Sequence, residues 1–178
     1  MSKKIFFLFC VLIATFELFA HPVPDIPVRA HLNDGELSIQ IELDLRCLTD
    51  DPIDSPYVFN KDLKKWSDEK IAKVFEDAKA YVNERIKFTL NPKGSFTPDL
   101  KCKFMLLGQG ELKGPDDVVV IAVEAKTSLE ELHKTYSVKS TKLNDLSLEV
   151  MNKRNGKKIP RIATLFPGEK SYEWALIR

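Results

Sequence analysis

Three histidines are the side chains of this sequence best suited to hold a transition metal. His21 directly follows Ala20, and cleavage between them would place a free α-amine and an imidazole on one residue. These two nitrogens can close a chelate ring, and such ligands favour copper and then nickel. Pro22 has no amide proton to lose, so further ligands must come from elsewhere, with His31 and His133 as candidates. A copper or nickel site of His21, His31 and His133 is therefore one hypothesis, and histidines without a bound metal, which the absence of H-x-H and H-E-x-x-H spacing favours, are the other.

Cys47 and Cys102 are the two cysteines that lie outside the N-terminal apolar segment. In an oxidising compartment such a pair most often forms a disulfide. The bridge would close a loop of about 55 residues and stabilise the fold by roughly 4 kcal/mol on the chain-entropy model. Two free buried thiols are the alternative, because nothing in the sequence brings the two Cα atoms together. We predict the disulfide.

The remaining motifs do not point to catalysis. The stretch "GQGELKG" at residues 108–114 has the wrong spacing for a dinucleotide-binding loop, and a G-x-S-x-G nucleophile elbow is absent from the sequence. The formal net charge of +1, without a basic stripe, argues against nucleic acid as a partner. We therefore expect a non-enzymatic domain that binds a partner, such as an envelope protein, or weakly binds a metal. A hydrolase or copper enzyme whose site converges only in three dimensions and a structural envelope protein are the alternatives.

The first twenty residues have the layout of a secretory signal peptide. Lys3 and Lys4 precede an apolar run over residues 5–16, and the segment ends in the small residue Ala20. The run is shorter than the about 20 apolar residues that a membrane span needs, so we expect no permanent span after cleavage. The sequence thus predicts a signal peptide over residues 1–20 and a single exported, β-rich domain over residues 21–178, located in the periplasm or secreted.

A β-hairpin is predicted near the start of this domain. In "LSIQIELDL", residues 37–45, apolar side chains occupy alternate positions, which is typical of a strand with one solvated face. A similar alternation from Val28 to Leu32 precedes it, and the "NDG" at residues 33–35 suits a turn with positive φ. In this hairpin His31 shares a face with Arg29, opposite the apolar side chains.

A helix that runs directly into a strand is predicted next. Ser67 can cap the helix, and Asp68 and Glu69 suit its positive first turn. Apolar residues then recur at helical spacing down to about Glu84, at Ile71, Val74, Phe75, Ala78 and Tyr81. The period changes to two at Ile86, Phe88 and Leu90, which indicates a strand.

Further strands are predicted toward the C-terminus. These are "KCKFMLL" at 101–107, "DVVVIAVEA" at 117–125, which is apolar on both faces, "LSLEVM" from 146, "RIATLF" from 161 and "YEWALI" from 172. Ser128 and Glu131 have the spacing of a capping box and predict a short helix over residues 128–132. The pattern favours a mainly β fold, an immunoglobulin-like β-sandwich with one inserted amphipathic α-helix. An α+β sheet with the helix packed on one face is the alternative.

The mature terminus "HPVP" resembles that of periplasmic copper-resistance carriers, which use an N-terminal histidine as a copper ligand. A broader likeness follows from the histidine–proline start, the hairpin, the helix that runs into a strand, and the closing "LFPGEKSYEWAL". In these features the sequence resembles the exported N-terminal domain found in front of nickel and cobalt permeases of the hydrogenase or urease accessory type. The resemblance implies a β-rich exported domain with a possible metal-binding role at His21.

Overall fold

The computed structural model describes residues 25–159 and 161–176. The protein is mainly β, with two sheets and one long helix, and the predicted β-sandwich with an inserted helix is confirmed. The leader segment and His21 lie outside the described residues.

The larger sheet is built around two strands from opposite ends of the described chain. The N-terminal β1 (Ile26–Asn33) pairs antiparallel with β2 (Glu36–Asp44) and parallel with β8 (Leu148–Arg154). The parallel pair brings the two ends of the described chain together. The hairpin predicted at the start of the domain is thus confirmed. The small β9 (Lys157–Lys158) pairs with β8. The strand order is β10 (Ala163–Leu165), β8 (Leu148–Arg154), β1 (Ile26–Asn33), β2 (Glu36–Asp44), β6 (Val119–Ser128) and β5 (Lys101–Leu106).

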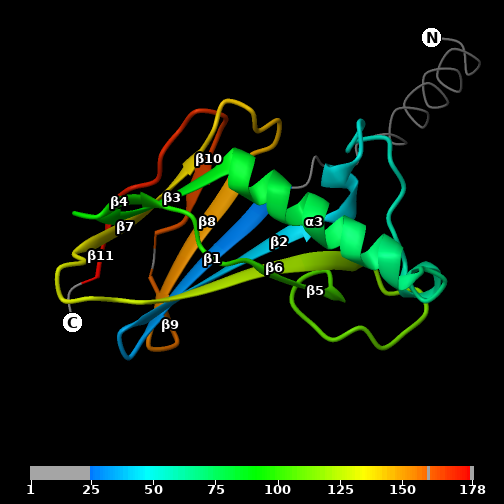
Figure 1. The fold of residues 1–178 in the computed structure, drawn as a ribbon, viewed down its shortest axis with the longest axis horizontal. Coiled ribbons are helices and arrows are strands. Elements are labelled where there is room, and N and C mark those ends of the chain that lie inside the picture. Colours follow the sequence, from blue (N-terminus) through cyan, green and yellow to red (C-terminus); the bar gives the residue numbers. More distant parts are fainter. Residues whose placement is uncertain (1–24, 160, 177–178) are drawn as a thin grey trace, which may run out of the picture.

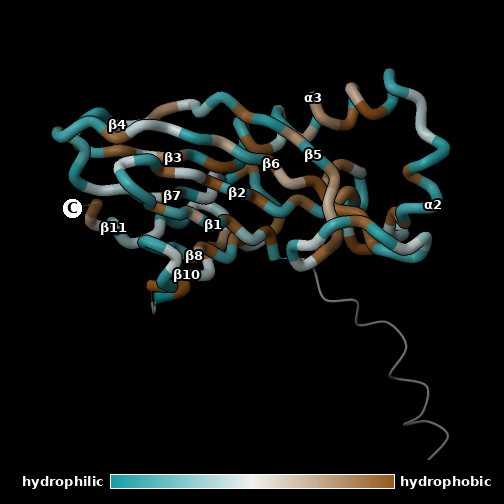
Figure 2. Tube along the Cα trace, turned by 90° about the horizontal axis from the view of Figure 1, so that it is seen from below, coloured by the Kyte–Doolittle hydropathy of each residue, from teal (hydrophilic) through white to brown (hydrophobic). Residues whose placement is uncertain are grey.

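The smaller sheet and the long helix α3 (Asp68–Arg85) form one layer over a single face of the larger sheet. Figure 1 shows α3 crossing in front of β1, β2 and β6 and continuing into β3 (Ile86–Asn91) of the smaller sheet. Seen edge-on in Figure 2, α3, β3 and β4 (Gly94–Phe96) lie above β1, β2 and β8. The smaller sheet has the order β11 (Trp174–Ala175), β7 (Thr135–Ser140), β3 (Ile86–Asn91) and β4 (Gly94–Phe96).

Helix α3 begins and ends as its sequence predicts. The hydroxyl of Ser67 accepts a hydrogen bond from the Lys70 amide at 3.3 Å, and acidic residues occupy the first turn. Ala78, Tyr81 and Val82 form the buried part of the helix. The Ile86 amide still bonds to a helical carbonyl while its backbone is already extended, so the helix passes into β3 without a loop.

The core lies between the two layers. Alternate residues of β1 and β2 point toward it, and these are fully or almost fully buried, as are the inward residues of β6, β3 and β7. Burial of such apolar side chains stabilises the fold by about 1.5 to 3 kcal/mol each before the entropy of ordering is subtracted. The inward set on β1 and β2 is Ile26, Val28, Ala30, Leu32, Leu37, Ile39, Ile41 and Leu43.

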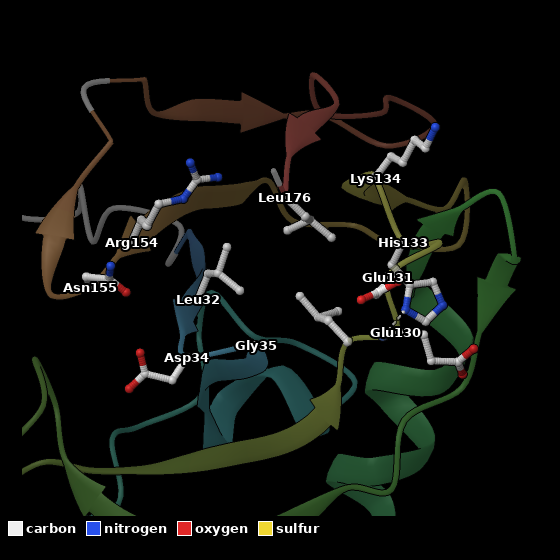
Figure 3. Close-up of a pocket in the computed structure, with 11 residues that line it drawn as sticks. Leu32, Asp34, Gly35, Glu130, Glu131, His133, Lys134, Arg154, Asn155 and Leu176 are labelled. Atoms are coloured by element: carbon white, nitrogen blue, oxygen red, sulfur yellow. Dashed lines mark hydrogen bonds between the residues drawn. The ribbon is translucent and has the colours of Figure 1, made fainter. Parts of the chain in front are cut away.

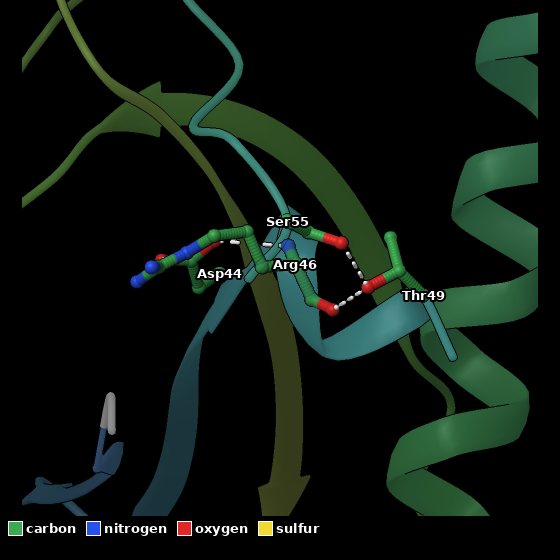
Figure 4. Close-up of polar contacts among 4 residues, drawn as sticks. All are labelled: Asp44, Arg46, Thr49 and Ser55. Atoms are coloured by element: carbon green, nitrogen blue, oxygen red, sulfur yellow. Dashed lines mark hydrogen bonds and ion pairs between the residues drawn. The ribbon is translucent and has the colours of Figure 1, made fainter. Parts of the chain in front are cut away.

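The outer face of the larger sheet carries ion pairs instead. Glu42 is only 5% exposed, and its carboxylate accepts hydrogen bonds from Arg29 and from the Gly108 amide, both at 2.9 Å. Asp44, the last residue of β2, caps the 3-10 segment η1 (Leu45–Leu48) and pairs with Arg46 (Figure 4). The Glu42 contacts hold the 106–110 loop against the sheet, and the Asp44–Arg46 pair holds the chain that follows β2. The short helix α2 (Asn60–Leu63) comes later in the chain.

The predicted disulfide is absent from the structure, in which Cys47 and Cys102 are both free. The β-ladders explain the difference. Cys102 on β5 pairs with Val123 on β6, which pairs with Ile41 on β2, so two strand spacings of about 4.8 Å separate Cys102 from β2. Cys47 lies farther along, in η1. A disulfide needs the two Cα atoms within about 7 Å.

One other expectation for the chain, near residue 130, differs from the structure. The short helix predicted over residues 128–132 is not formed, because β6 continues to Ser128, whose partner in β2 is Glu36. The residues that follow form a turn and lead into β7, a strand that the sequence analysis did not predict. His133 therefore lies just before a strand and not on a helix.

Candidate functional site

A pocket lies where the turns at one end of the sandwich meet. The β1–β2 turn at Asp34–Gly35 and the β8–β9 turn at Asn155 come together because β1 and β8 run in parallel. The Asn155 amide donates to the carbonyl of Leu32 at 3.0 Å, and the Leu129 amide donates to the carbonyl of Gly35 at 2.8 Å. Gly35 has a φ of 80°, a conformation that favours glycine.

The pocket has a volume of about 850 Å³. Ligand sites in proteins span about 300 to 1,000 Å³, so the pocket has the size of a site for a small organic molecule. Its walls come from the two turns, the β6–β7 connection and the C-terminal end of the described chain (Figure 3). The lining residues are Leu32, Asp34, Gly35, Leu129, Glu130, Glu131, His133, Lys134, Arg154, Asn155 and Leu176.

Three leucines make the pocket partly apolar. Leu32 ends the inward row of β1, Leu129 follows β6, and Leu176 follows β11. Leu176 is held in place because its amide donates to the carbonyl of Lys134 at 2.7 Å. Leucines from three separate elements thus converge, which gives a ligand an apolar surface to cover.

The pocket also carries charged side chains of both signs. Arg154, at the end of β8, donates from Nη2 to the carbonyl of Ala175, and its guanidinium lies 5.7 Å from the centre of the Trp174 ring. Glu130 pairs with Lys93 at 3.7 Å. Within residues 25–159 and 161–176, no other charged residue of the pocket belongs to an ion pair. The charges of Asp34, Glu131, Lys134 and Arg154 are therefore available to a ligand.

His133 lies in the wall of the pocket and is 7% exposed. Its Nδ1 accepts a hydrogen bond from the Glu130 amide at 3.1 Å, so a neutral ring carries its proton on Nε2. Nε2 is buried and has no hydrogen-bond partner among the described residues. Through this hydrogen bond His133 stabilises the turn before β7.

His31 lies on the other side of the larger sheet from this pocket. It precedes the pocket residue Leu32 on β1, and successive side chains of a strand point to opposite faces. Burial, and then the positive charges of Lys153 and Arg29, lower the pKa of His31. His31 and His133 therefore do not share a site, which corrects the predicted three-histidine cluster. His21 lies outside the described residues.

A metal site is not evident elsewhere in the part of the chain that the structure describes. No group of three or more histidine, cysteine, aspartate or glutamate side chains there could hold a metal ion. In the same residues, no helix is both long and apolar enough to cross a membrane.

A second, smaller pocket of about 280 Å³ lies beside α3, next to Cys47. Burial, followed by the negative charge of Asp44, raises the pKa of this thiol to about 12. A thiol with such a pKa is protonated at neutral pH and is a poor nucleophile. Burial also raises the pKa of Cys102. Neither cysteine has the properties of a catalytic residue.

The pocket at the end of the sandwich was not found from the sequence. The turn at residues 33–35 was predicted, but its contact with the turn at Asn155 depends on the parallel pairing of β1 with β8. Arg154 and Leu176 carry no motif that would mark them. Comparison with protein-family models finds no match, and no curated protein matches the sequence.

Proposed function

We propose that the protein is an exported, non-enzymatic binding domain and that the pocket at the end of the sandwich is its binding site. The observation that carries the proposal is the pocket itself, in which three leucines from separate elements lie among charged side chains. Binding sites for small molecules and peptide segments are concave and largely apolar, with a few polar groups that fix orientation. His133, the titratable group best suited to proton transfer, is buried and already bonded to a backbone amide.

The leader-like segment over residues 1–20 supports export. The exported domain then meets its ligand or protein partner in the periplasm or outside the cell. The resemblance to exported domains in front of nickel and cobalt permeases is part of the proposal. It is supported by the element order, in which a hairpin is followed by a helix that runs into a strand. Intact mass of the secreted protein tests export, and retention of Met1 would contradict it.

Metal binding at His21 is a second proposal, which depends on cleavage after Ala20. Copper titration of the secreted protein should then show a site that is lost in His21→Ala. A mature terminus other than His21, or copper binding that His21→Ala leaves unchanged, would contradict this proposal.

The pocket is tested with a dye and two matched variants. Leu129→Trp places a larger side chain in the pocket, whereas Leu143→Trp changes a leucine that is 62% exposed and does not line it. Titration with 1-anilinonaphthalene-8-sulfonate should show saturable binding to the wild type and to Leu143→Trp. Leu129→Trp should bind at least tenfold more weakly while its circular dichroism spectrum is unchanged. Equal binding by all three proteins, or no binding to the wild type, would refute the pocket as a binding site.

A further inference from the structure

Charged side chains flank the apolar part of the pocket. Figure 3 shows Arg154, with Asp34, on one side of Leu32 and Leu176, and Glu131, with Lys134, on the other. Arg154 belongs to the end of β8, and Glu131 belongs to the turn between β6 and β7. The two do not form an ion pair with each other. An apolar surface thus separates a cation from an anion.

Most N–H donors of the Arg154 guanidinium have no acceptor among the described residues. It has five N–H groups, and the described residues provide one acceptor, the carbonyl of Ala175. Nε is buried without a partner, and no carboxylate in residues 25–159 or 161–176 pairs with the side chain. A guanidinium presents a planar fork of donors that fits a carboxylate in a bidentate manner. The side of the pocket at Arg154 therefore favours a ligand carboxylate.

Glu131 provides the complementary charge. Its carboxylate is exposed, points toward the leucines in Figure 3, and has no hydrogen-bond or ion-pair partner among the described residues. An ionised carboxylate only accepts hydrogen bonds, so it suits a donor such as a ligand ammonium group. Asp34 and Lys134 also line the pocket and, like Glu131, are exposed, so an ammonium group at Glu131 should contribute less to binding than a carboxylate at the half-buried Arg154.

We propose that the pocket binds a short apolar peptide with free termini. The peptide carboxylate pairs with Arg154, its ammonium group pairs with Glu131, and its apolar side chains cover Leu32 and Leu176. A volume of about 850 Å³ exceeds the needs of one amino acid and suits a peptide of a few residues. This inference rests on the proposed function, because it names the ligand of the same pocket.

A fatty acid fits this arrangement less well than a peptide. Its carboxylate could pair with Arg154, but its hydrocarbon chain would then lie against the charged carboxylate of Glu131 with no donor to offer. Removing a carboxylate from water without a partner is unfavourable. A zwitterionic ligand satisfies both charged side chains, and a fatty acid satisfies one.

The test uses calorimetric titration of the secreted protein with leucyl-leucyl-leucine, its N-acetyl form, its C-terminal amide and dodecanoate. Amidation of the carboxylate removes charge-assisted hydrogen bonds to Arg154 and should weaken binding about tenfold or more. Acetylation of the amine, whose partner Glu131 is exposed, should weaken binding about two- to fivefold. Arg154→Gln should bind the free acid and the amide equally, and Glu131→Gln should bind the free amine and its acetylated form equally. Arg161→Gln and Glu76→Gln, which change exposed residues outside the pocket, should behave as the wild type.

Several outcomes would overturn the peptide assignment. Blocked peptides that bind as tightly as the free peptide would exclude a role for the charged termini, and tighter binding of dodecanoate would favour a lipid. Dye binding without any peptide binding would refute the ligand class and leave the binding pocket intact. Failure of both dye and peptide to bind would refute the pocket and the peptide together. The blocked peptides test the wild type directly, so the conclusion does not require that Arg154→Gln folds.

Discussion

Replacement of Asp44 by alanine should destabilise the protein strongly, although Asp44 lies next to a surface loop. One carboxylate oxygen accepts from the Arg46 amide at 2.9 Å and so caps η1. The other accepts from Nε and Nη2 of Arg46 at 3.1 and 2.8 Å (Figure 4). Asp44 is 7% exposed and Arg46 3%, so the pair is nearly excluded from water.

The expected loss follows from what Asp44→Ala leaves behind. The Arg46 guanidinium would remain nearly buried with no anion, stacked on the Tyr57 ring at 3.8 Å. Removing one partner of a buried ion pair costs about 3 to 5 kcal/mol, and loss of a capping bond costs about 1 kcal/mol. The lower end of this range together with the lost cap gives an expected loss of about 4 kcal/mol in the free energy of unfolding.

Urea unfolding followed by tryptophan fluorescence measures this loss. Asp116→Ala is the matched control, because it removes a carboxylate from a pair with Lys61 in which both side chains are exposed. The control should lose less than about 1 kcal/mol. Asp44→Ala combined with Arg46→Met should recover part of the stability, since no unpaired charge then remains. A loss for Asp44→Ala no larger than that of the control would refute the reasoning.

Two further predictions follow from shifted pKa values. Burial raises the pKa of Cys47 to about 12 and also raises the pKa of Cys102. Both thiols should therefore react slowly with Ellman's reagent at pH 8 and rapidly once urea unfolds the chain. A disulfide between them would leave neither thiol to react and would contradict this prediction. Burial and the charges of Lys153 and Arg29 lower the pKa of His31 in the folded protein. Below about pH 6.5 the imidazole of His31 is therefore protonated more readily in the unfolded chain than in the folded one. The free energy of unfolding should fall as the pH decreases through this range. His31→Gln should reduce this decline, and an unchanged pH profile would count against it.

Local patterns in the sequence predicted the elements whose stability depends on near neighbours. The period-two alternation and the "NDG" turn predicted the β1–β2 hairpin, and Ser67 with the apolar spacing after it predicted α3 and its passage into β3. These signals lie within a few residues of the elements that they specify. The β-sandwich with one inserted helix followed from their number and order.

The features that were missed depend on contacts between distant residues. Ser128 and Glu131 favour a helix start locally, but pairing with β2 keeps residue 128 in β6. The distance between Cys47 and Cys102 depends on strand order, which the sequence alone did not reveal. Arg154 and Glu131 face the same pocket because of the parallel pairing of β1 with β8 and the turn before β7.

The position of β1 also has a consequence for how the chain folds. In Figure 1 this blue strand lies between its neighbour in the chain and the orange β8, which comes from the opposite end. The middle of the larger sheet therefore cannot be completed until the last third of the polypeptide has left the ribosome or a translocation channel. Pairing over such a long separation slows folding, and until it happens β1 presents an open backbone edge to any other unfolded chain nearby.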